Sequence, residues 1–89
     1  MSTFYNAPHI LYTVELKGIY LLNPLKKISC MLAYPETAVW DLICRGEYSC
    51  ETIISMLCYI ASLNYQQSEK LTIKTLTYLI EKGYILKKS

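Results

Sequence analysis

The heptapeptide Ile28-Ser-Cys-Met-Leu-Ala-Tyr34 is the stretch around which we expect the chain to be organised. It is uncharged and prone to form a strand, and it lies between Lys26-Lys27 and Pro35. Two strand-like runs precede it, and only helical patterns follow it. We therefore expect residues 28–34 to be the last strand of a small sheet and its free edge. Such an edge carries unpaired N–H and C=O groups that can accept another extended chain.

Two further strands are expected before this stretch. Residues 9–16 are rich in Tyr, Thr, Val and Ile and have the period-two pattern of a strand, and residues 19–22 form the second run. Lys17-Gly18 predicts a tight turn between them. Asn23-Pro24 then breaks the second run and begins another reversal. Connections this short favour an antiparallel meander.

Three helices are expected after the strands. Pro35 suits the first turn of the first helix, and Gly46 ends it. Ser49 is a good N-cap for the second helix, and Ser68 for the third, which Gly83 stops. The side chains expected to face the core share helical spacing: Ala38, Val39, Leu42, Ile43, Ile53, Leu57, Ile60, Ala61, Ile73, Leu76, Leu79 and Ile80. The expected fold is α+β, a three-stranded antiparallel sheet followed by a three-helix, winged-helix-like bundle.

Length and charge limit the classes of function. Eighty-nine residues make one domain, which we place at residues 9–86 between a flexible N-terminus (1–8) and a basic tail (87–89). The chain is 53% hydrophobic, so we expect part of its apolar surface to stay exposed for a partner or a second copy. The net charge of +2 is too weak to indicate nucleic acid or an anionic membrane.

The four cysteines, Cys30, Cys44, Cys50 and Cys58, form no Cys-x-x-Cys pair, and there is no signal peptide. Each lies in an apolar segment, where a free cysteine behaves as a small hydrophobic residue. We expect reduced, buried thiols in a cytoplasmic protein. Disulfides or a metal site are the alternatives.

No pattern indicates catalysis. The single histidine, His9, lies in the N-terminal region and is expected to be an ordinary exposed or half-buried side chain. The acidic residues lie at helix starts and turns, and each glycine is explained by a turn or a helix end. We expect Trp40 to pack beneath the hairpin. The chain is predicted not to be an enzyme and to need no cofactor or metal.

The order of four segments resembles the PqqD-like family. These are Gly18-Ile-Tyr-Leu-Leu-Asn-Pro24, Pro35-Glu-Thr-Ala-Val-Trp-Asp-Leu-Ile43, Gly46-Glu-Tyr-Ser-Cys-Glu-Thr-Ile53 and Leu76-x-x-Leu79-x-x-x-Gly83-Tyr-Ile85. The likeness covers about residues 9–86. Leu32-Ala33 departs from the Leu-Asn that is frequent in the family before the first helix, and Thr72 and Thr75 stand where aliphatic or aromatic residues are common.

The resemblance implies a recognition element of ribosomal peptide natural-product biosynthesis (a RiPP recognition element). Such domains bind the leader of a precursor peptide and present it to a maturation enzyme, such as a radical-SAM enzyme or a leader peptidase. The leader adds as a strand to the third strand, in the cleft beside the third helix. The residues predicted to bind it are Ile28, Ser29, Cys30, Met31, Leu32, Ala33, Tyr34, Leu71, Lys74, Thr75, Tyr78 and Lys82.

Which alternate side chains of residues 28–34 face the peptide stays open, because a one-residue slip in register inverts the assignment. Lys74 and Lys82 are expected either to pair with acidic leader residues or to form a solvated helix face. The second candidate function is a winged-helix nucleic-acid-binding domain of a transcriptional regulator. A homodimer that pairs through its own free edge is the third.

Overall fold

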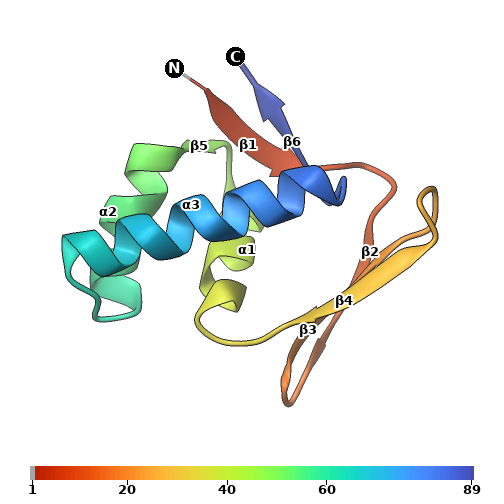
Figure 1. Ribbon diagram of the computed structural model, residues 1–89, viewed down its shortest axis with the longest axis horizontal. Helices are drawn as coiled ribbons and strands as arrows, with labels where there is room; N and C mark the ends of the chain where they lie inside the picture. Colours follow the sequence, from red (N-terminus) through yellow and green to blue (C-terminus); the bar gives the residue numbers. More distant parts are fainter. Residues whose placement is uncertain (1) are drawn as a thin grey trace.

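The elements of the protein form two small sheets and three helices. Its structure, a computed structural model, describes residues 2–89 (Figure 1). In chain order the elements are β1 (Thr3–Asn6), β2 (Leu11–Glu15), β3 (Gly18–Asn23), β4 (Ile28–Leu32), α1 (Glu36–Arg45), β5 (Tyr48–Ser49), α2 (Cys50–Ile60), α3 (Tyr65–Glu81) and β6 (Ile85–Lys88). The α+β fold, with its three-stranded antiparallel sheet and three helices, agrees with the prediction.

The predicted meander is the sheet β2–β3–β4, with β3 in the centre. Glu15 pairs with Gly18 across a two-residue turn, and Asn23 pairs with Ile28 across a four-residue turn. The two outer strands are shorter than the predicted runs, because β2 spans Leu11–Glu15 and β4 ends at Leu32, whereas β3 is one residue longer at each end than predicted. Ala33 and Tyr34 belong to the connection into α1.

The second sheet was not predicted. β1 lies between β5 and β6, antiparallel to both, so the two ends of the chain lie side by side (Figure 1). Thr3–Asn6, which were expected to belong to a flexible N-terminus, instead form a strand whose Phe4 is buried in the core. The basic tail also joins this sheet, since β6 includes Lys87 and Lys88.

The helix ends agree with the sequence except at α3. Ser49 caps α2 by accepting a hydrogen bond from the Thr52 amide. The prediction that Ser68 caps α3 is wrong, because the helix begins one turn earlier. Its cap is Asn64, which forms a reciprocal capping box with Gln67. Ser68 is instead fully buried and donates a hydrogen bond to the Ile54 carbonyl at 2.6 Å, joining α3 to α2.

The core lies between the helices and the inner faces of the sheets. Its fully buried side chains include Leu21, Trp40, Leu57, Leu79 and Tyr84. Trp40 packs as predicted and meets the edge of the Tyr12 ring, with ring centroids 5.6 Å apart.

Three predicted core residues are exposed: Ile60 at 54%, Ile73 at 52% and Ile80 at 39%. On α3 the buried stripe is rotated, so that Thr72 and Thr75 face inward in place of the two isoleucines. All four cysteines in the described chain are free thiols, but the predicted burial is wrong, because Cys30, Cys50 and Cys58 are only half-buried and Cys44 is exposed. Within residues 2–89 no helix has the length and apolar composition needed to span a membrane.

Asn23 fixes the position of the β3–β4 turn against the end of α3. Its buried amide donates to the Lys82 carbonyl at 2.9 Å, and its Oδ1 accepts from the Lys26 amide at 3.3 Å. The Lys26 ammonium adds a 3.1 Å hydrogen bond to the Glu81 carbonyl. These contacts hold the meander beside α3.

Replacing Asn23 with alanine is expected to lower the free energy of unfolding by about 2 kcal/mol, because a part-buried carbonyl and a part-buried amide lose their hydrogen-bond partner. Urea denaturation measures the change. Asn64→Ala is the matched control, since it removes only an exposed helix cap and is expected to cost about 1 kcal/mol. Equal losses in the two variants would contradict the role given to Asn23.

Candidate functional site

The backbone of β4 is open on one side. β4 pairs with β3 alone within the described chain, and β2 is the outer strand at the opposite edge of the sheet. Because only two residues separate Glu15 from Gly18, this pair is a hydrogen-bonded pair, and hydrogen-bonded pairs alternate along an antiparallel ladder. Like Gly18, Tyr20 and Leu22 therefore direct their backbone N–H and C=O groups toward β2.

The opposite set of β3 residues bonds toward β4, at the pairs Ile19–Leu32, Leu21–Cys30 and Asn23–Ile28. This alternation shows which residues of β4 direct their backbone groups into the sheet and which direct them outward. The backbone groups of Ile28, Cys30 and Leu32 are used inside the sheet, whereas the N–H and C=O groups of Ser29 and Met31 point outward.

Side chains of β4 alternate between the two faces of the sheet. Leu32 is buried, Ile28 and Cys30 are half-buried, and Ser29 and Met31 are exposed. The first three share the inner face with their buried β3 partners, because directly paired residues point to the same side. In an added strand, residues opposite Cys30 and Leu32 would therefore point to this inner face.

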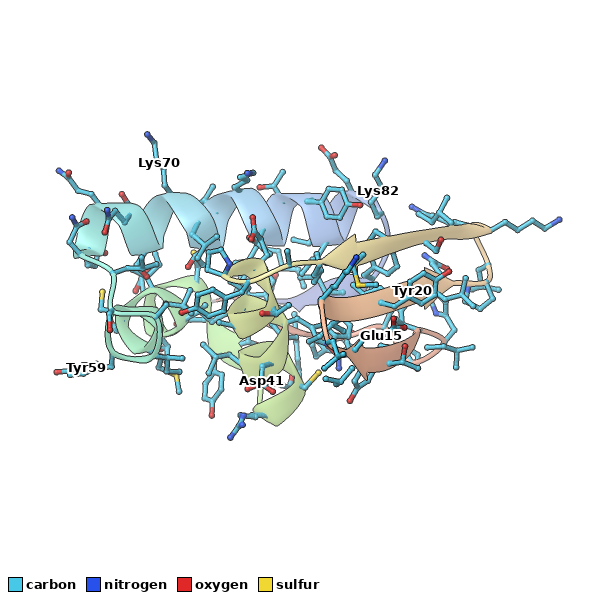
Figure 2. The ribbon with its side chains drawn as sticks, turned by 90° about the horizontal axis from the view of Figure 1, so that it is seen from below. Glu15, Tyr20, Asp41, Tyr59, Lys70 and Lys82 are labelled. Carbon is cyan, nitrogen blue, oxygen red and sulfur yellow. The ribbon has the colours of Figure 1, made fainter. Side chains whose placement is uncertain are left out.

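A hollow of about 400 Å³ lies between the end of β4 and α3. We call it the β4–α3 groove. Figure 2 shows β4 running beside the C-terminal half of α3, where Lys82 projects from the outer side of the helix. The groove is lined by Met31, Leu32, Ala33, Glu36, Lys74, Thr75 and Tyr78. Its lining is largely apolar, with Glu36 and Lys74 as its two charged residues.

Of the twelve predicted binding residues, six line this groove: Met31, Leu32, Ala33, Lys74, Thr75 and Tyr78. Ile28, Ser29 and Cys30 lie farther back along β4. Leu71, Lys82 and Tyr34 lie outside the groove, with Leu71 packed against the core, Lys82 exposed, and Tyr34 lining a different hollow. Glu36 was missed as a lining residue, because a carboxylate at a helix start is explained by the helix dipole alone.

Thr75 places a buried hydroxyl beside the groove. The residue is 3% exposed, and its Oγ1 has no hydrogen-bond partner. A threonine inside a helix commonly bonds a carbonyl one turn earlier, so this hydroxyl is unusual. A buried hydroxyl without a partner lowers the stability of the fold, so Thr75 is a position at which a substitution can stabilise the protein.

Thr75→Val is expected to raise the free energy of unfolding by about 1 kcal/mol, because it removes an unsatisfied hydroxyl and keeps the branched shape. Chemical denaturation checks this. Thr77→Val on the exposed side of the same helix should change stability by less than about 0.5 kcal/mol. A destabilised Thr75→Val protein would show that the hydroxyl makes a bond the structure lacks.

The side chains of Tyr78 and Tyr84 lie near the Cys30 thiol of β4. Burial raises the pKa of Tyr78, and the neighbouring Cys30 thiol contributes to the same shift. Burial raises the pKa of Tyr84 more strongly, again with a contribution from Cys30. Both phenols are therefore neutral at ordinary pH. Within residues 2–89 no three His, Cys, Asp or Glu side chains cluster closely enough to hold a metal ion.

The comparisons with known proteins agree on the fold. No family model matches the chain, and no curated protein sequence matches it. Two solved structures do match. One is a lasso peptide synthetase B1 complexed with the leader peptide, at a TM-score of 0.79 and 19% identity over 93% of this chain and 96% of that chain. The other is TbiB1 in complex with the TbiA(beta) leader peptide, at a TM-score of 0.80 and 17% identity over 91% and 93% of the two chains.

These likenesses extend over nearly the whole chain and show that it has the fold of leader-binding B1 proteins. At such low identity they carry the fold alone. The fold expected from the PqqD-like resemblance is therefore confirmed, and the ligand must be argued from the groove.

Proposed function

We propose that the protein is a non-catalytic peptide-binding module, which captures the leader of a ribosomally made precursor peptide by strand addition to β4 and presents it to a modifying enzyme. The observation that carries this proposal is the unpaired edge of β4 beside an apolar groove. That two proteins of the same fold are solved with leader peptides supports it.

Attachment would come from the backbone. The outward groups of Ser29 and Met31 provide two hydrogen-bonded pairs for an extended chain, independent of its sequence. Selectivity would come from the ligand side chains that point inward opposite Cys30 and Leu32. They meet the groove, where Tyr78 offers an apolar wall and Lys74 a partner for an acidic residue.

Catalysis belongs to a partner in this proposal. The only histidine, His9, is half-buried and lies outside the β4–α3 groove, and no nucleophile–base pair lines that groove. The module would act in the cytoplasm beside a maturation enzyme, of which a radical-SAM enzyme and a leader peptidase are the two classes expected. It would raise the local concentration of the precursor near that enzyme.

The nucleic-acid alternative is not favoured. α3 carries Lys70 and Lys74, but it has no arginine and no asparagine or glutamine after Ser68 that would recognise base edges. Figure 2 shows Lys70 and Lys82 well apart along the helix. Lysines spaced in this way are typical of a solvated helix face and not of a dense basic patch.

Titration with a synthetic precursor leader peptide tests the proposal. Amide NMR shifts are expected at residues 28–34 and along the side of α3 that carries Lys74 and Tyr78. A random-sequence DNA duplex is the control and should shift none of them. Self-pairing of β4 would appear as concentration-dependent shifts of the same amides without peptide. Saturable leader binding that leaves β4 and α3 unshifted would contradict the proposed site.

A further inference from the structure

A second hollow, of about 420 Å³, lies at the end of the sheet where β2 turns into β3. We call it the hairpin-end hollow. Four parts of the chain form it: the turn end of the β2–β3 hairpin, the connection from β4 into α1, α1 itself, and the last residue of α2. Four of its apolar side chains are strongly exposed, namely Val14 at 76%, Leu16 at 108%, Tyr34 at 65% and Ile60 at 54%. Exposed apolar side chains gathered around one hollow are typical of an interaction site.

The hairpin-end hollow lies next to the β4–α3 groove. Ala33 lines the groove, and the next residue, Tyr34, lines the hollow. Leu32 lines the groove, and its β3 partner Ile19 lines the hollow. On α1, Glu36 faces the groove while Thr37 belongs to the hollow. Only the connection between β4 and α1 separates the two sites.

A strand added to β4 would run toward this hollow. The sheet is antiparallel throughout, and an antiparallel pair is slightly more stable per residue than a parallel one. The N-terminal end of an antiparallel ligand would then lie at Leu32. Extended chain advances about 3.3 Å per residue, so roughly two to four further residues would pass Ala33 and Tyr34.

We propose that the hairpin-end hollow binds the N-terminal flank of the peptide whose strand lies on β4; this inference rests on the function proposed above. The flank would insert an apolar side chain among Leu16, Tyr34 and Ile60. The lining also carries the carboxylates of Glu15 and Asp41 and the ammonium of Lys17, and Figure 2 labels Glu15 and Asp41. Asp41 pairs with Arg45 at 3.0 Å, and Glu15 accepts a hydrogen bond from Thr13 at 3.1 Å, so the apolar side chains define the proposed contact.

Calorimetric titration of two peptides tests the proposal: a synthetic precursor leader peptide, and the same leader shortened from its N-terminus to the segment that covers β4. The full leader is expected to bind the wild-type protein about tenfold more tightly than the short one, as burial of one apolar side chain predicts. Leu16→Ser and Ile60→Ser should each remove most of this advantage and leave the affinity for the short peptide unchanged.

Leu25→Ser is the matched control, because Leu25 is 74% exposed but lies in the β3–β4 turn, outside both sites. It should bind both peptides as the wild type does. Equal affinities of the two peptides for the wild-type protein would overturn the inference, as would full-leader binding that neither variant weakens. Failure of the proposed function is a separate result, in which neither peptide binds the wild-type protein at all.

Discussion

Replacing Met31 with proline is expected to weaken leader binding at least about 30-fold, corresponding to about 2 kcal/mol. The Met31 N–H is one of the outward donors of β4, and proline has none to offer. The fold should persist, since this N–H makes no bond within the sheet and edge strands tolerate proline. Calorimetry with the leader measures the affinity, and circular dichroism checks the fold.

The control is Val14→Pro, which places the same change on the other edge of the same sheet. Val14 pairs with Ile19 in a pair that is not hydrogen-bonded, so its N–H also points outward. Because Val14 also lines the hairpin-end hollow, both variants are compared with the leader shortened to the β4 segment. This peptide does not reach the hollow, so its affinity reports on strand addition alone. With this peptide, Val14→Pro should bind as the wild type does. A folded Met31→Pro protein with unchanged affinity would contradict strand addition to β4.

Gly18→Ala is expected to lower the free energy of unfolding by roughly 3 kcal/mol or more. A Cβ at this position would lie 1.9 Å from the Leu32 carbonyl oxygen, and the backbone φ of +152° is one that side chains rarely adopt. The atom it meets is backbone in the neighbouring strand, so relief requires β4 to shift. The open edge would move with it, and leader affinity should fall together with stability in urea denaturation.

Gly46→Ala provides the comparison. Its φ of 178° is ordinary extended backbone. The nearest atoms to an added Cβ are 3.3 to 3.5 Å away in the Tyr48 side chain, which can move. A change within about 1 kcal/mol is therefore expected. If both alanine variants were equally stable, the close packing of β3 against β4 would not be what holds the edge in place.

Local sequence signals predict most of the meander and the helices, because each depends on near neighbours. The alternation in residues 9–16, the breaks at Gly18 and Asn23-Pro24, and the Ser49 cap all act within a few residues. β1 has no such signal. Its four residues become a strand only because β5 and β6, more than forty residues away, supply partners on both sides. Non-local pairing of this kind leaves no periodic trace in so short a segment.

The rotation of α3 shows a second limit. Ile73 and Ile80 are more hydrophobic than Thr72 and Thr75, so helical periodicity assigns the isoleucines to the core. The structure buries the threonines, because the contact of Ser68 with α2 and of Asn23 with the end of α3 fix how the helix is turned. Packing at the two ends of α3 thus decides which residues meet the core and the groove.

The free edge of β4 was predicted, but the direction of its backbone groups was not. The turn expected at Lys17-Gly18 lies at Leu16-Lys17, one residue earlier. A shift of one residue inverts every inward and outward assignment along the ladder. The observed Glu15–Gly18 pair is what assigns the outward positions to Ser29 and Met31.

Amide hydrogen exchange of β4, followed by NMR with and without saturating leader, tests the central claim most directly. In the free protein, Ser29 and Met31 should exchange quickly and Cys30 slowly, because of these three amides only that of Cys30 is bonded within the sheet. With leader bound, Ser29 and Met31 should become protected. A saturated complex in which both amides still exchange quickly would contradict strand addition.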